Sequence, residues 1–370
     1  MSLFGPSTLS YLGVDIGSSS IKMVELKKVQ DRVALVSYGF SDKLATNYSS
    51  TNRLDIKLVT SVIEGIVRKA NFSPIHNVIA SLPTFTVFSS IINLSSKISD
   101  KELDSSVAWE AKKVIPLPLQ DIVLYWQKVN ETSKKPEVKP IAPVVVNTSP
   151  VAVTAAASAD NYKILLIGAP KNLTKSYAYA FKSMNFNLIS LETEIFGMIR
   201  SLIGPDKTTT MIVQIGASSS NIFVVDAGVP VLSRSIDIGG LAVTKAVSKS
   251  LQLDLAKAEQ FKYDLASHAE GGIPKMITDT MAPVFNEIRY IAEVYATKEN
   301  NEIKKVILTG GGAMLFGLAE YVQNLIQINT VVGDPWFRVS YPVELKPILE
   351  QIGPRLSVAI GLAMYEYDKA

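Results

Sequence analysis

The sequence predicts an α/β protein in which one structural unit occurs twice. The first observation is an alternating apolar run, residues 12–16, followed by a turn of Gly and Ser and a second apolar run, residues 21–26. This pattern is typical of two antiparallel strands joined by a tight turn. The second observation is that residues 211–225 repeat the hairpin about 200 positions later, with glycine and serines again in the turn. Two copies of one hairpin indicate an internally duplicated fold.

A third observation is the segment Gly310-Gly311-Gly312, which follows the apolar residues 306–309. We expect a strand, a turn without side chains and then the start of a helix. Such a turn lets a flat base approach the backbone, and the start of a helix offers N–H groups to anions. The segment is therefore a candidate binding element.

The two hairpin turns, Gly17 to Ser20 and Gly216 to Ser220, carry no bulky side chain. Their backbone N–H groups could therefore close on a phosphate. Asp15 stands just before the first turn, where a carboxylate could hold a hydrated Mg²⁺. Taken alone, each turn fits an ordinary hairpin at least as well, because such short motifs match by chance.

Composition excludes several classes of protein. A chain of 370 residues with 47% hydrophobic and 19% charged residues forms two or more globular domains. The net charge of +3, without a block of Lys or Arg, argues against nucleic-acid binding. The absence of cysteine excludes disulfides and thiolate metal sites, and two histidines cannot build a zinc site.

We expect a cytoplasmic protein without direct membrane insertion. The start of the chain lacks the basic segment of a signal peptide. The longest uncharged runs, residues 77–96 and 141–159, are interrupted by prolines and are rich in Ser, Thr or Ala. Any contact with a membrane would then come through a partner protein.

The elements of the first half follow from apolar periodicity. We expect a third strand at 33–40, a helix at 54–70 and strands at 77–82 and 86–94.

Composition changes near residue 95. A capping box at 99–102 opens a helix with Leu103, Val107, Ala111 and Val114 on one stripe, and prolines at 116 and 118 end it. Residues 130–160 are rich in Pro, Ala, Val, Ser and Thr, so we expect a mobile loop. Together with strands at 122–129 and 162–168 and a helix at 173–184, this segment predicts a separate α/β unit at 95–187. A strand at 188–191 then leads back to the main body.

The second half repeats the three-strand meander at 211–214, 221–226 and 229–237. Predicted helices are 194–202, 241–250, 255–265, 279–296, 315–327 and 354–365, with a short strand at 330–332. We therefore divide the chain into a first lobe at 1–94 completed by 188–205 and 350–370, the insertion at 95–187, and a second lobe at 206–349.

Two glycine–serine hairpins, the Glu259 and Lys262 pair and the late glycine turn, in this order, resemble the actin-like ATPase superfamily. The resemblance implies an actin-like two-lobed fold of duplicated ribonuclease H-like domains that grips ATP and Mg²⁺. The residues that it places at the nucleotide are Asp15, Gly17, Ser18, Ser19, Ser20, Gly216, Ala217, Ser218, Ser219, Ser220, Glu259, Lys262, Gly310, Gly311, Gly312 and Met314. Asp15 would hold the metal through water, and Glu194 would align the attacking water. Without the other elements, Glu259 and Lys262 fit a solvated helical ion pair better.

Within that superfamily the chain resembles the PilM family of type IV pilus assembly. The most specific stretch is 107–118, where Val-Ala-Trp-Glu-Ala and Ile-Pro-Leu-Pro match the family pattern. The resemblance implies that 95–187 is an FtsA-like subdomain 1C. It also implies binding of the cytoplasmic N-terminal peptide of a PilN-like inner-membrane protein, which would recruit the chain to the membrane. Trp109 and Ile115 fit either that groove or the core.

One departure concerns hydrolysis. Gln214 stands where many superfamily members carry Asp, and an amide supplies no negative charge to Mg²⁺ or to a general base. We therefore expect ATP binding with slow or absent turnover. An FtsA-like filament protein and a small-molecule kinase remain alternatives. FtsA needs a C-terminal amphipathic anchor, whereas a kinase needs a catalytic Asp. The sequence does not decide whether the nucleotide is ATP or GTP, or whether the chain associates with itself.

Overall fold

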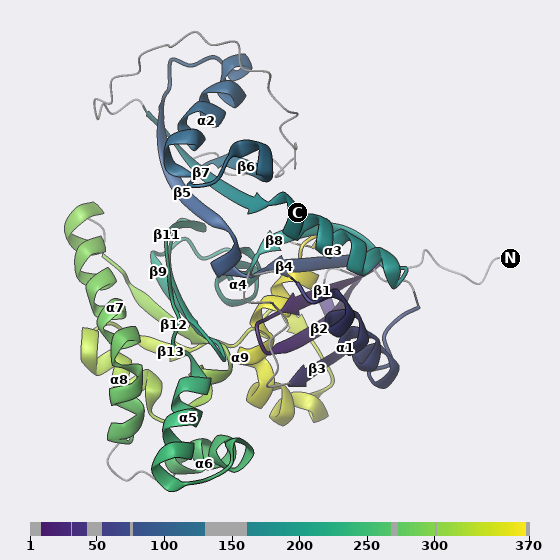
Figure 1. The fold of residues 1–370 in the computed structure, drawn as a ribbon, viewed down its shortest axis with the longest axis vertical. Coiled ribbons are helices and arrows are strands. Elements are labelled where there is room, and N and C mark those ends of the chain that lie inside the picture. The colour runs from purple at the N-terminus through teal and green to yellow at the C-terminus, as the bar shows by residue number, and fades with distance from the viewer. Residues whose placement is uncertain are drawn as a thin grey trace, which may run out of the picture. The chain divides into compact units, whose positions relative to one another are not determined.

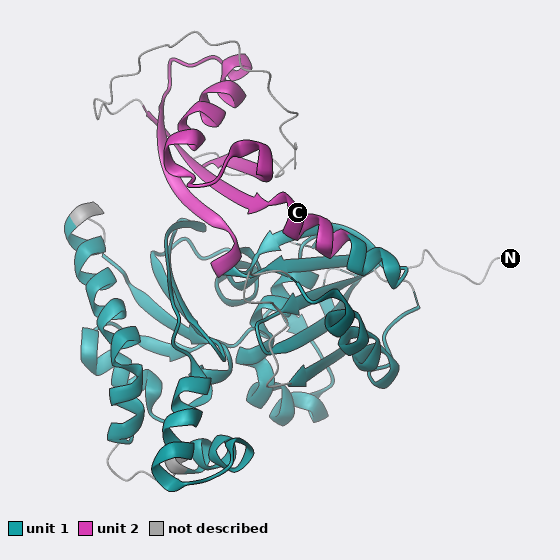
Figure 2. Cartoon of the chain, in the orientation of Figure 1, with its two compact units in different colours: residues 1–84, 179–370 teal, residues 85–178 magenta. Residues whose placement is uncertain are grey.

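The computed structural model describes residues 9–30, 32–42, 54–74, 77–129, 161–267, 273–299 and 302–367. Contacts divide the chain into two compact units, which Figure 2 shows in different colours. The main unit comprises residues 1–84 and 179–370, and the inserted unit comprises residues 85–178. The loop expected at 130–160 lies outside the described residues. The predicted insertion at 95–187 overlaps the inserted unit, and the three-part division of the chain stays a proposal.

The main unit contains two sheets with one shared strand order (Figure 1). In the first sheet, β1 (Ser10–Ile16), β2 (Ser20–Val29) and β3 (Arg32–Asp42) form an antiparallel meander. The parallel strands β4 (Asn77–Leu82) and β8 (Asn187–Thr193) continue the sheet beside β1, and β14 (Val339–Ser340) pairs with β3.

The second sheet repeats this plan. Its meander consists of β9 (Thr210–Ile215), β10 (Ser220–Asp226) and β11 (Val229–Ile236), and β12 (Lys305–Thr309) and β13 (Thr330–Val332) follow in parallel beside β9. The two strand orders coincide over five strands, so the internal duplication predicted from the hairpins is confirmed.

Helices cover both faces of the second sheet. On one face, α5 (Gly240–Leu251), α6 (Leu255–Ser267), α7 (Lys275–Glu299) and α8 (Leu318–Ile326) share a core with β9, β10 and β12. On the other face, Ile212, Phe223 and Ile307 pack against α4 (Glu194–Met198) and α9 (Lys346–Ala363). Because both faces are covered, the central strands are continuous apolar runs rather than alternating ones.

Helix α9 also packs on the first sheet, through Leu356 and Ile360 against Val24 and Leu26. The approach is close because glycines face backbone: a Cβ on Gly13 would lie under 3.0 Å from the Ala359 carbonyl. The opposite face of this sheet carries α1 (Ile56–Lys69), whose N-terminal amide at Leu58 is capped by Asp55 at 3.0 Å. Helix α9 therefore lies between the two sheets and contacts both.

Three helices differ from their predicted bounds by four residues or more at one end. Helix α7 begins at Lys275, four residues before the predicted start at 279. Helix α9 begins at Lys346, and Pro354, predicted as its first residue, lies inside it. The prediction followed the apolar residues from Leu356 onward, but burial of Leu349 and Gly353 extends the helix on the N-terminal side. The helix predicted at 194–202 is the short α4, followed by a π-helical turn at Ile199–Ile203.

The inserted unit has a three-stranded antiparallel sheet in the order β5 (Phe88–Ser95), β7 (Asn161–Pro170), β6 (Ile122–Lys128). Helix α2 (Asp100–Val114) buries Leu103, Val107 and Ala111 against this sheet as predicted, and α3 (Lys171–Ser183) follows β7. Val114 was placed on the same stripe, but it is exposed and Ile115 is buried in its place. Of the two groove-or-core candidates, Ile115 belongs to the core, whereas Trp109 is 43% exposed.

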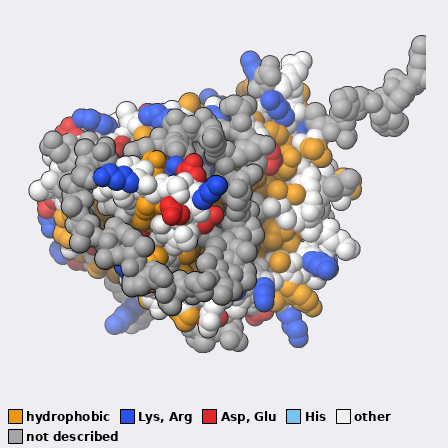
Figure 3. Space-filling view, turned by 90° about the horizontal axis from the view of Figure 1, so that it is seen from above, with side chains coloured by type: hydrophobic (Ala, Val, Ile, Leu, Met, Phe, Trp, Pro, Cys, Tyr) orange, Lys and Arg blue, Asp and Glu red, His pale blue; other side chains and the backbone are white. Residues whose placement is uncertain are grey.

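The face drawn in Figure 3 does not carry a single kind of charge. On the coloured part of the face in Figure 3, basic, acidic and apolar side chains lie interspersed. Within the described ranges, none of the helices combines the length and apolar character that crossing a membrane requires.

Candidate functional site

The turns of the two repeated hairpins touch one another. Ser18 Oγ of the β1–β2 turn lies 2.6 Å from Ser218 Oγ of the β9–β10 turn. Each turn is closed in the same way: Gly17 N–H donates to the Ser20 carbonyl at 3.0 Å, and Gly216 N–H donates to the Ser219 carbonyl at 2.9 Å. The duplication thus brings two similar glycine–serine turns together within the main unit.

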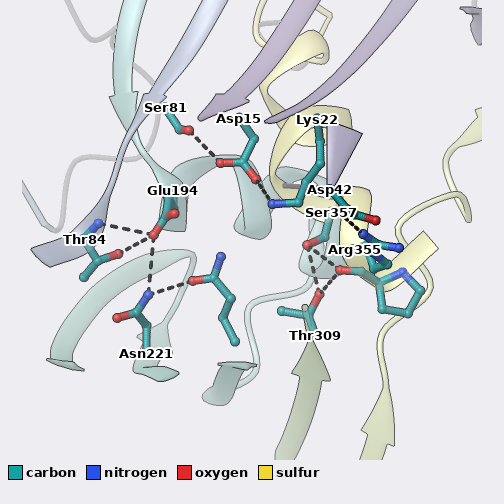
Figure 4. A network of polar contacts seen from close by, with 12 residues as sticks. Asp15, Lys22, Asp42, Ser81, Thr84, Glu194, Asn221, Thr309, Arg355 and Ser357 are labelled. Atoms are coloured by element: carbon teal, nitrogen blue, oxygen red, sulfur yellow. Dashed lines mark hydrogen bonds and ion pairs between the residues drawn. The ribbon is translucent and has the colours of Figure 1, made fainter. Parts of the chain in front are cut away.

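A buried ion pair lies beside the first turn. The Lys22 ammonium donates to Asp15 Oδ2 at 3.0 Å, and Ser81 Oγ donates to Asp15 Oδ1 at 3.0 Å (Figure 4). A Cβ placed on Gly17 would lie 3.3 Å from Lys22 Nζ, so the ammonium lies against the turn itself. The first turn therefore offers a cation next to backbone, an arrangement suited to an anion.

Glu194, at the start of α4, is held by groups from two other segments. Its Oε2 accepts bonds from Thr84 Oγ1 at 2.7 Å and from the Thr84 amide at 3.2 Å. Asn221 Nδ2 of β10 approaches the same oxygen at 3.5 Å (Figure 4). Burial, and secondarily the negative charge of Asp15, raises the pKa of Glu194 to about 7. The carboxyl is thus able to exchange a proton near neutral pH.

The amide of Gln214 is engaged by its neighbour. Asn221 Nδ2 donates to Gln214 Oε1 at 2.9 Å, so one amide nitrogen serves both Gln214 and Glu194. Asn221 Oδ1 is buried and has no hydrogen-bond partner among the described residues. A buried carbonyl oxygen of this kind can accept a hydrogen bond from a bound water or from a ligand.

Glu259 and Lys262 lie beneath the second turn. Lys262 Nζ is 2.7 Å from Glu259 Oε1 and 3.3 Å from Thr244 Oγ1, and the lysine is only 2% exposed. A solvated helical ion pair, the alternative from sequence, is therefore wrong for the lysine. Burial lowers the pKa of Lys262, and the Glu259 carboxylate opposes this shift. Helix α5 connects the pair to the turn, because the amides of Gly240 and Leu241 donate to the carbonyls of Gly216 and Ala217.

The glycine turn packs against the end of β9. Gly310 has a φ of +84°, and a Cβ there or on Gly312 would lie under 3.0 Å from Ile215. The Gly310 amide also donates to the Pro354 carbonyl of α9 at 2.9 Å. Since Ile215 immediately precedes Gly216, the glycine turn is a direct neighbour of the second hairpin turn. Met314, at the end of the turn, is half-buried.

The two hairpin turns, the glycine turn and Lys262 thus lie close together within the main unit, and their role as a nucleotide site stays a prediction. Sequence reasoning missed Lys22, Ser81, Thr84 and Asn221. Lys22 could have been found, because it lies two residues after Ser20 on one strand and so projects from the same face. The others come from segments whose proximity no local pattern indicates. A cavity of about 380 Å³ between Arg32, Phe337 and Tyr367 contains none of the predicted residues.

No set of three or more Asp, Glu, Cys or His side chains able to hold a metal occurs in the parts of the chain that the structure describes. Both oxygens of Asp15 already accept hydrogen bonds. These residues fit a Mg²⁺ ion only if phosphates and waters supply most of its ligands, which is how Mg²⁺ is commonly bound.

Solved structures support the fold. The chain is similar to one in a PilM-PilN type IV pilus biogenesis complex, with 21% identity, a TM-score of 0.76 and coverage of 96% of this chain and 98% of that one. It is also similar to the ethanolamine utilization protein EutJ from Carboxydothermus hydrogenoformans, with 15% identity, a TM-score of 0.52 and coverage of 98% and 92%. MreB5 of Spiroplasma citri bound to ADP gives 11% identity, a TM-score of 0.53 and coverage of 98% and 97%. The fold is the actin-like fold predicted from the hairpins.

The sequence profile of the family described as type IV pilus assembly protein PilM matches residues 13–367. This range includes both hairpins, the inserted unit, the glycine turn and α9. The chain therefore belongs to the PilM family of type IV pilus assembly proteins.

Proposed function

We propose that the chain is a cytoplasmic ATP-binding scaffold of pilus assembly that is recruited to the inner membrane by a PilN-like partner. The observation that carries ATP binding is the contact between Ser18 and Ser218, with Lys22 against the first turn. Two glycine–serine turns without bulky side chains, with an adjacent ammonium, are suited to a chain of phosphates. The similar MreB5 structure contains ADP, which supports a nucleotide in this fold.

The partner proposal rests on family membership and on the similar chain from a PilM-PilN complex. We propose that the cytoplasmic N-terminal peptide of a PilN-like protein contacts the inserted unit. Trp109 is the candidate contact, because a large aromatic side chain that is 43% exposed on α2 is available to a partner. Ile115 is buried and is not a candidate.

When bound, Mg²⁺ would neutralise phosphate charge, and Asp15 would hold it through water. Lys22 balances the Asp15 charge and orients this carboxylate, together with Ser81. Glu194 would hold the attacking water, and Thr84 fixes its carboxyl. Gln214 adds no charge, and its oxygen is occupied by Asn221. We therefore propose that hydrolysis is slow or absent.

A kinase needs a catalytic Asp, and two candidates from the sequence are Asp15 and Asp226. Asp15 is tied to Lys22 and Ser81, and Asp226 Oδ1 accepts a bond from Thr209 Oγ1 at 2.8 Å. Neither carboxylate is placed to take a proton from an acceptor hydroxyl.

The test of ATP binding is calorimetric titration of the purified chain with Mg·ATP. Lys22→Met should weaken binding at least tenfold, whereas Lys28→Met, at the exposed far end of the same strand, should leave it unchanged. Melting temperatures are measured in parallel, because Lys22→Met leaves the buried Asp15 without its cation. Absence of binding to the wild-type chain at millimolar ATP would refute the proposal.

A further inference from the structure

A cavity of about 380 Å³ lies where β3, β14 and the segment after α9 meet, and its described lining includes none of the residues of the proposed nucleotide site. A volume of this size is ordinary for a small-molecule pocket. Val33 of β3 and Val339 of β14 are paired in the sheet, and both line the cavity together with Met364. These apolar residues belong to the core that α9 forms with the first sheet, or pack against it. The cavity is therefore built on two paired strands and the core of the main unit.

Two arginines line this cavity, and its described lining contains no Asp or Glu. Arg338 is held in place, because its Nη1 donates to the Arg200 carbonyl at 3.1 Å. A Cβ on Gly204 would lie 3.1 Å from Arg338 Cδ, so the stem of the arginine passes close to that backbone. Arg32, at the start of β3, is exposed. The cavity thus has positive charge that no carboxylate of the described lining neutralises.

Phe337 lines the cavity from an anchored turn. Its neighbour Trp336 is buried, and the indole N–H of Trp336 donates to the Leu349 carbonyl at 2.8 Å. The Val339 amide donates to the Trp336 carbonyl at 2.8 Å and closes the turn. Phe337, between these two fixed positions, is 53% exposed. The fold therefore keeps a large aromatic side chain at the cavity although the core does not use it.

Tyr367 contributes its ring rather than its hydroxyl. The hydroxyl donates to the Leu9 carbonyl at 2.8 Å and approaches the Leu26 carbonyl at 3.2 Å, so it is engaged with backbone. Burial, and to a smaller extent the negative charges of Glu25 and Glu366, raises the pKa of Tyr367, and the phenol stays neutral. Both carboxylates are outside the described lining. The cavity therefore combines cationic groups with neutral aromatic surface.

We propose that this cavity binds a small organic anion in which a carboxylate or a phosphate is attached to a flat apolar body. Arg32 and Arg338 would bind the oxyanion, because the N–H groups of a guanidinium match the spacing of carboxylate and phosphate oxygens. Phe337 and Tyr367 would contact the flat body through their rings. The proposal does not depend on ATP binding, since the cavity shares no residue with the glycine–serine turns.

The test uses 1-naphthyl phosphate and 1-naphthoate as probes, with 1-naphthol and inorganic phosphate as the separate halves of the ligand. Calorimetric affinities are measured on the full chain, and melting temperatures control for folding. We expect at least one of the two anionic naphthyl probes to bind at least tenfold more tightly than 1-naphthol and than inorganic phosphate. The tighter of the two identifies the oxyanion that the cavity prefers.

Matched variants assign the binding to this cavity. Arg32→Met should weaken it at least tenfold, whereas Arg68→Met, in the last turn of α1, should leave it within twofold. Phe337→Ala should weaken it at least fivefold, whereas Tyr290→Ala, at a residue of comparable exposure on α7, should not. Lys22→Met, which tests the hairpin turns, should leave probe binding unchanged, and Arg32→Met should leave ATP affinity unchanged.

Four results would overturn the proposal. Equal affinity for 1-naphthol and the anionic probes would remove the role of the arginines, and loss of probe binding in Lys22→Met would place the probe at the hairpin turns. Unchanged affinity in both Arg32→Met and Phe337→Ala would exclude this cavity, as would a wild-type chain that binds neither anionic probe at millimolar concentration. A chain that binds the probes but not ATP would refute the proposed function and leave this site standing.

Discussion

Ser18 Oγ and Ser218 Oγ form a hydrogen bond of 2.6 Å although they lie 200 positions apart in the sequence. The two hydroxyls belong to equivalent turns of a duplicated unit. The contact therefore joins the two halves of the main unit at the same position of each repeat. A triphosphate held between the turns would replace this bond with bonds to phosphate oxygens. Five predictions test the site and the packing that forms it.

Replacing Glu194 should change how stability depends on pH. The pKa of Glu194 is about 7 in the folded chain, whereas an ordinary glutamate has a pKa of 4.5. Between these two pH values the carboxyl is therefore protonated in the folded chain and ionised in the unfolded chain. Stability contributed by this group is therefore present below pH 4.5 and falls as pH rises toward 7, by a loss on the order of 3 kcal/mol. Glu194→Gln should remove that loss, and its melting temperature should exceed that of the wild type at pH 8 more than at pH 5.

Glu64→Gln, on the exposed face of α1, is the control for the loss of one acidic side chain. If Glu194→Gln follows the wild-type pH profile as closely as this control does, the carboxyl is not held in the way described.

Gly311→Glu should abolish ATP binding and leave the fold intact. A Cβ at this position makes only ordinary contacts, with Arg355 Cγ and Nε at 3.9 Å, so the fold accepts a side chain there, and the added carboxylate would lie at the glycine turn that we propose faces the nucleotide. Gly310→Ala is the contrasting variant, because a φ of +84° and the nearby Ile215 backbone make a side chain there destabilising. Equilibrium titration with ATP and thermal melts separate the two effects. Wild-type ATP affinity in Gly311→Glu would show that the site is misplaced.

Gly361→Ala should destabilise the chain by about 3 kcal/mol through overpacking. A Cβ there would lie under 3.0 Å from the Gly197 carbonyl, where α9 and α4 pack backbone to backbone. Gly65→Ala on α1 is the control, since nothing lies within 4 Å of its Cβ position. It should stabilise the chain by about 0.5–1 kcal/mol, because alanine favours the helix. Urea denaturation measures both, and equal effects would contradict the close packing of the two helices.

Trp109→Ala should weaken binding of a PilN-like N-terminal peptide at least tenfold and leave the melting temperature nearly unchanged, because this residue is 43% exposed and is not part of the core of the inserted unit. Ile115→Ala should instead lower stability by about 2–5 kcal/mol, because Ile115 belongs to the core of the inserted unit. Isothermal titration with the peptide provides the measurement. Undiminished peptide binding by Trp109→Ala would show that the peptide contacts another part of the chain.

Gln214→Asp should raise the rate of ATP hydrolysis at least tenfold, because it adds a negative charge for Mg²⁺ beside the second turn. Gln214→Asn is the matched control, since it shortens the side chain equally without adding charge. Phosphate release under single-turnover conditions reports the rate. Equal rates in both variants would mean that the missing charge is not what limits turnover.

Much of the fold was predictable because it depends on local periodicity. The strands of both meanders, α1 and the core stripe of α2 follow from apolar residues spaced by two, three or four positions. The start of α9 was mispredicted, because the prediction followed the apolar residues from Leu356 onward, whereas the burial of Leu349 and Gly353 extends the helix. The exposure of Val114 was missed for a similar reason: the chain leaves the helix at Ile115, and that side chain enters the core instead.

The site residues likewise fall into those that a local pattern predicts and those that only the folded chain brings together. The sequence by itself determined the two turns, the glycine segment and the Glu259–Lys262 pair, because each consists of neighbours along the chain whose small side chains or helical spacing restrict the backbone. Only the tertiary structure decided that Thr84 and Asn221 hold Glu194, and that Arg355 faces Gly311 and pairs with Asp42. Asp42 and Arg355 are 313 positions apart, and their meeting depends on how α9 packs between the two sheets. Such packing is set by shape complementarity over the whole core, which no short stretch of sequence specifies.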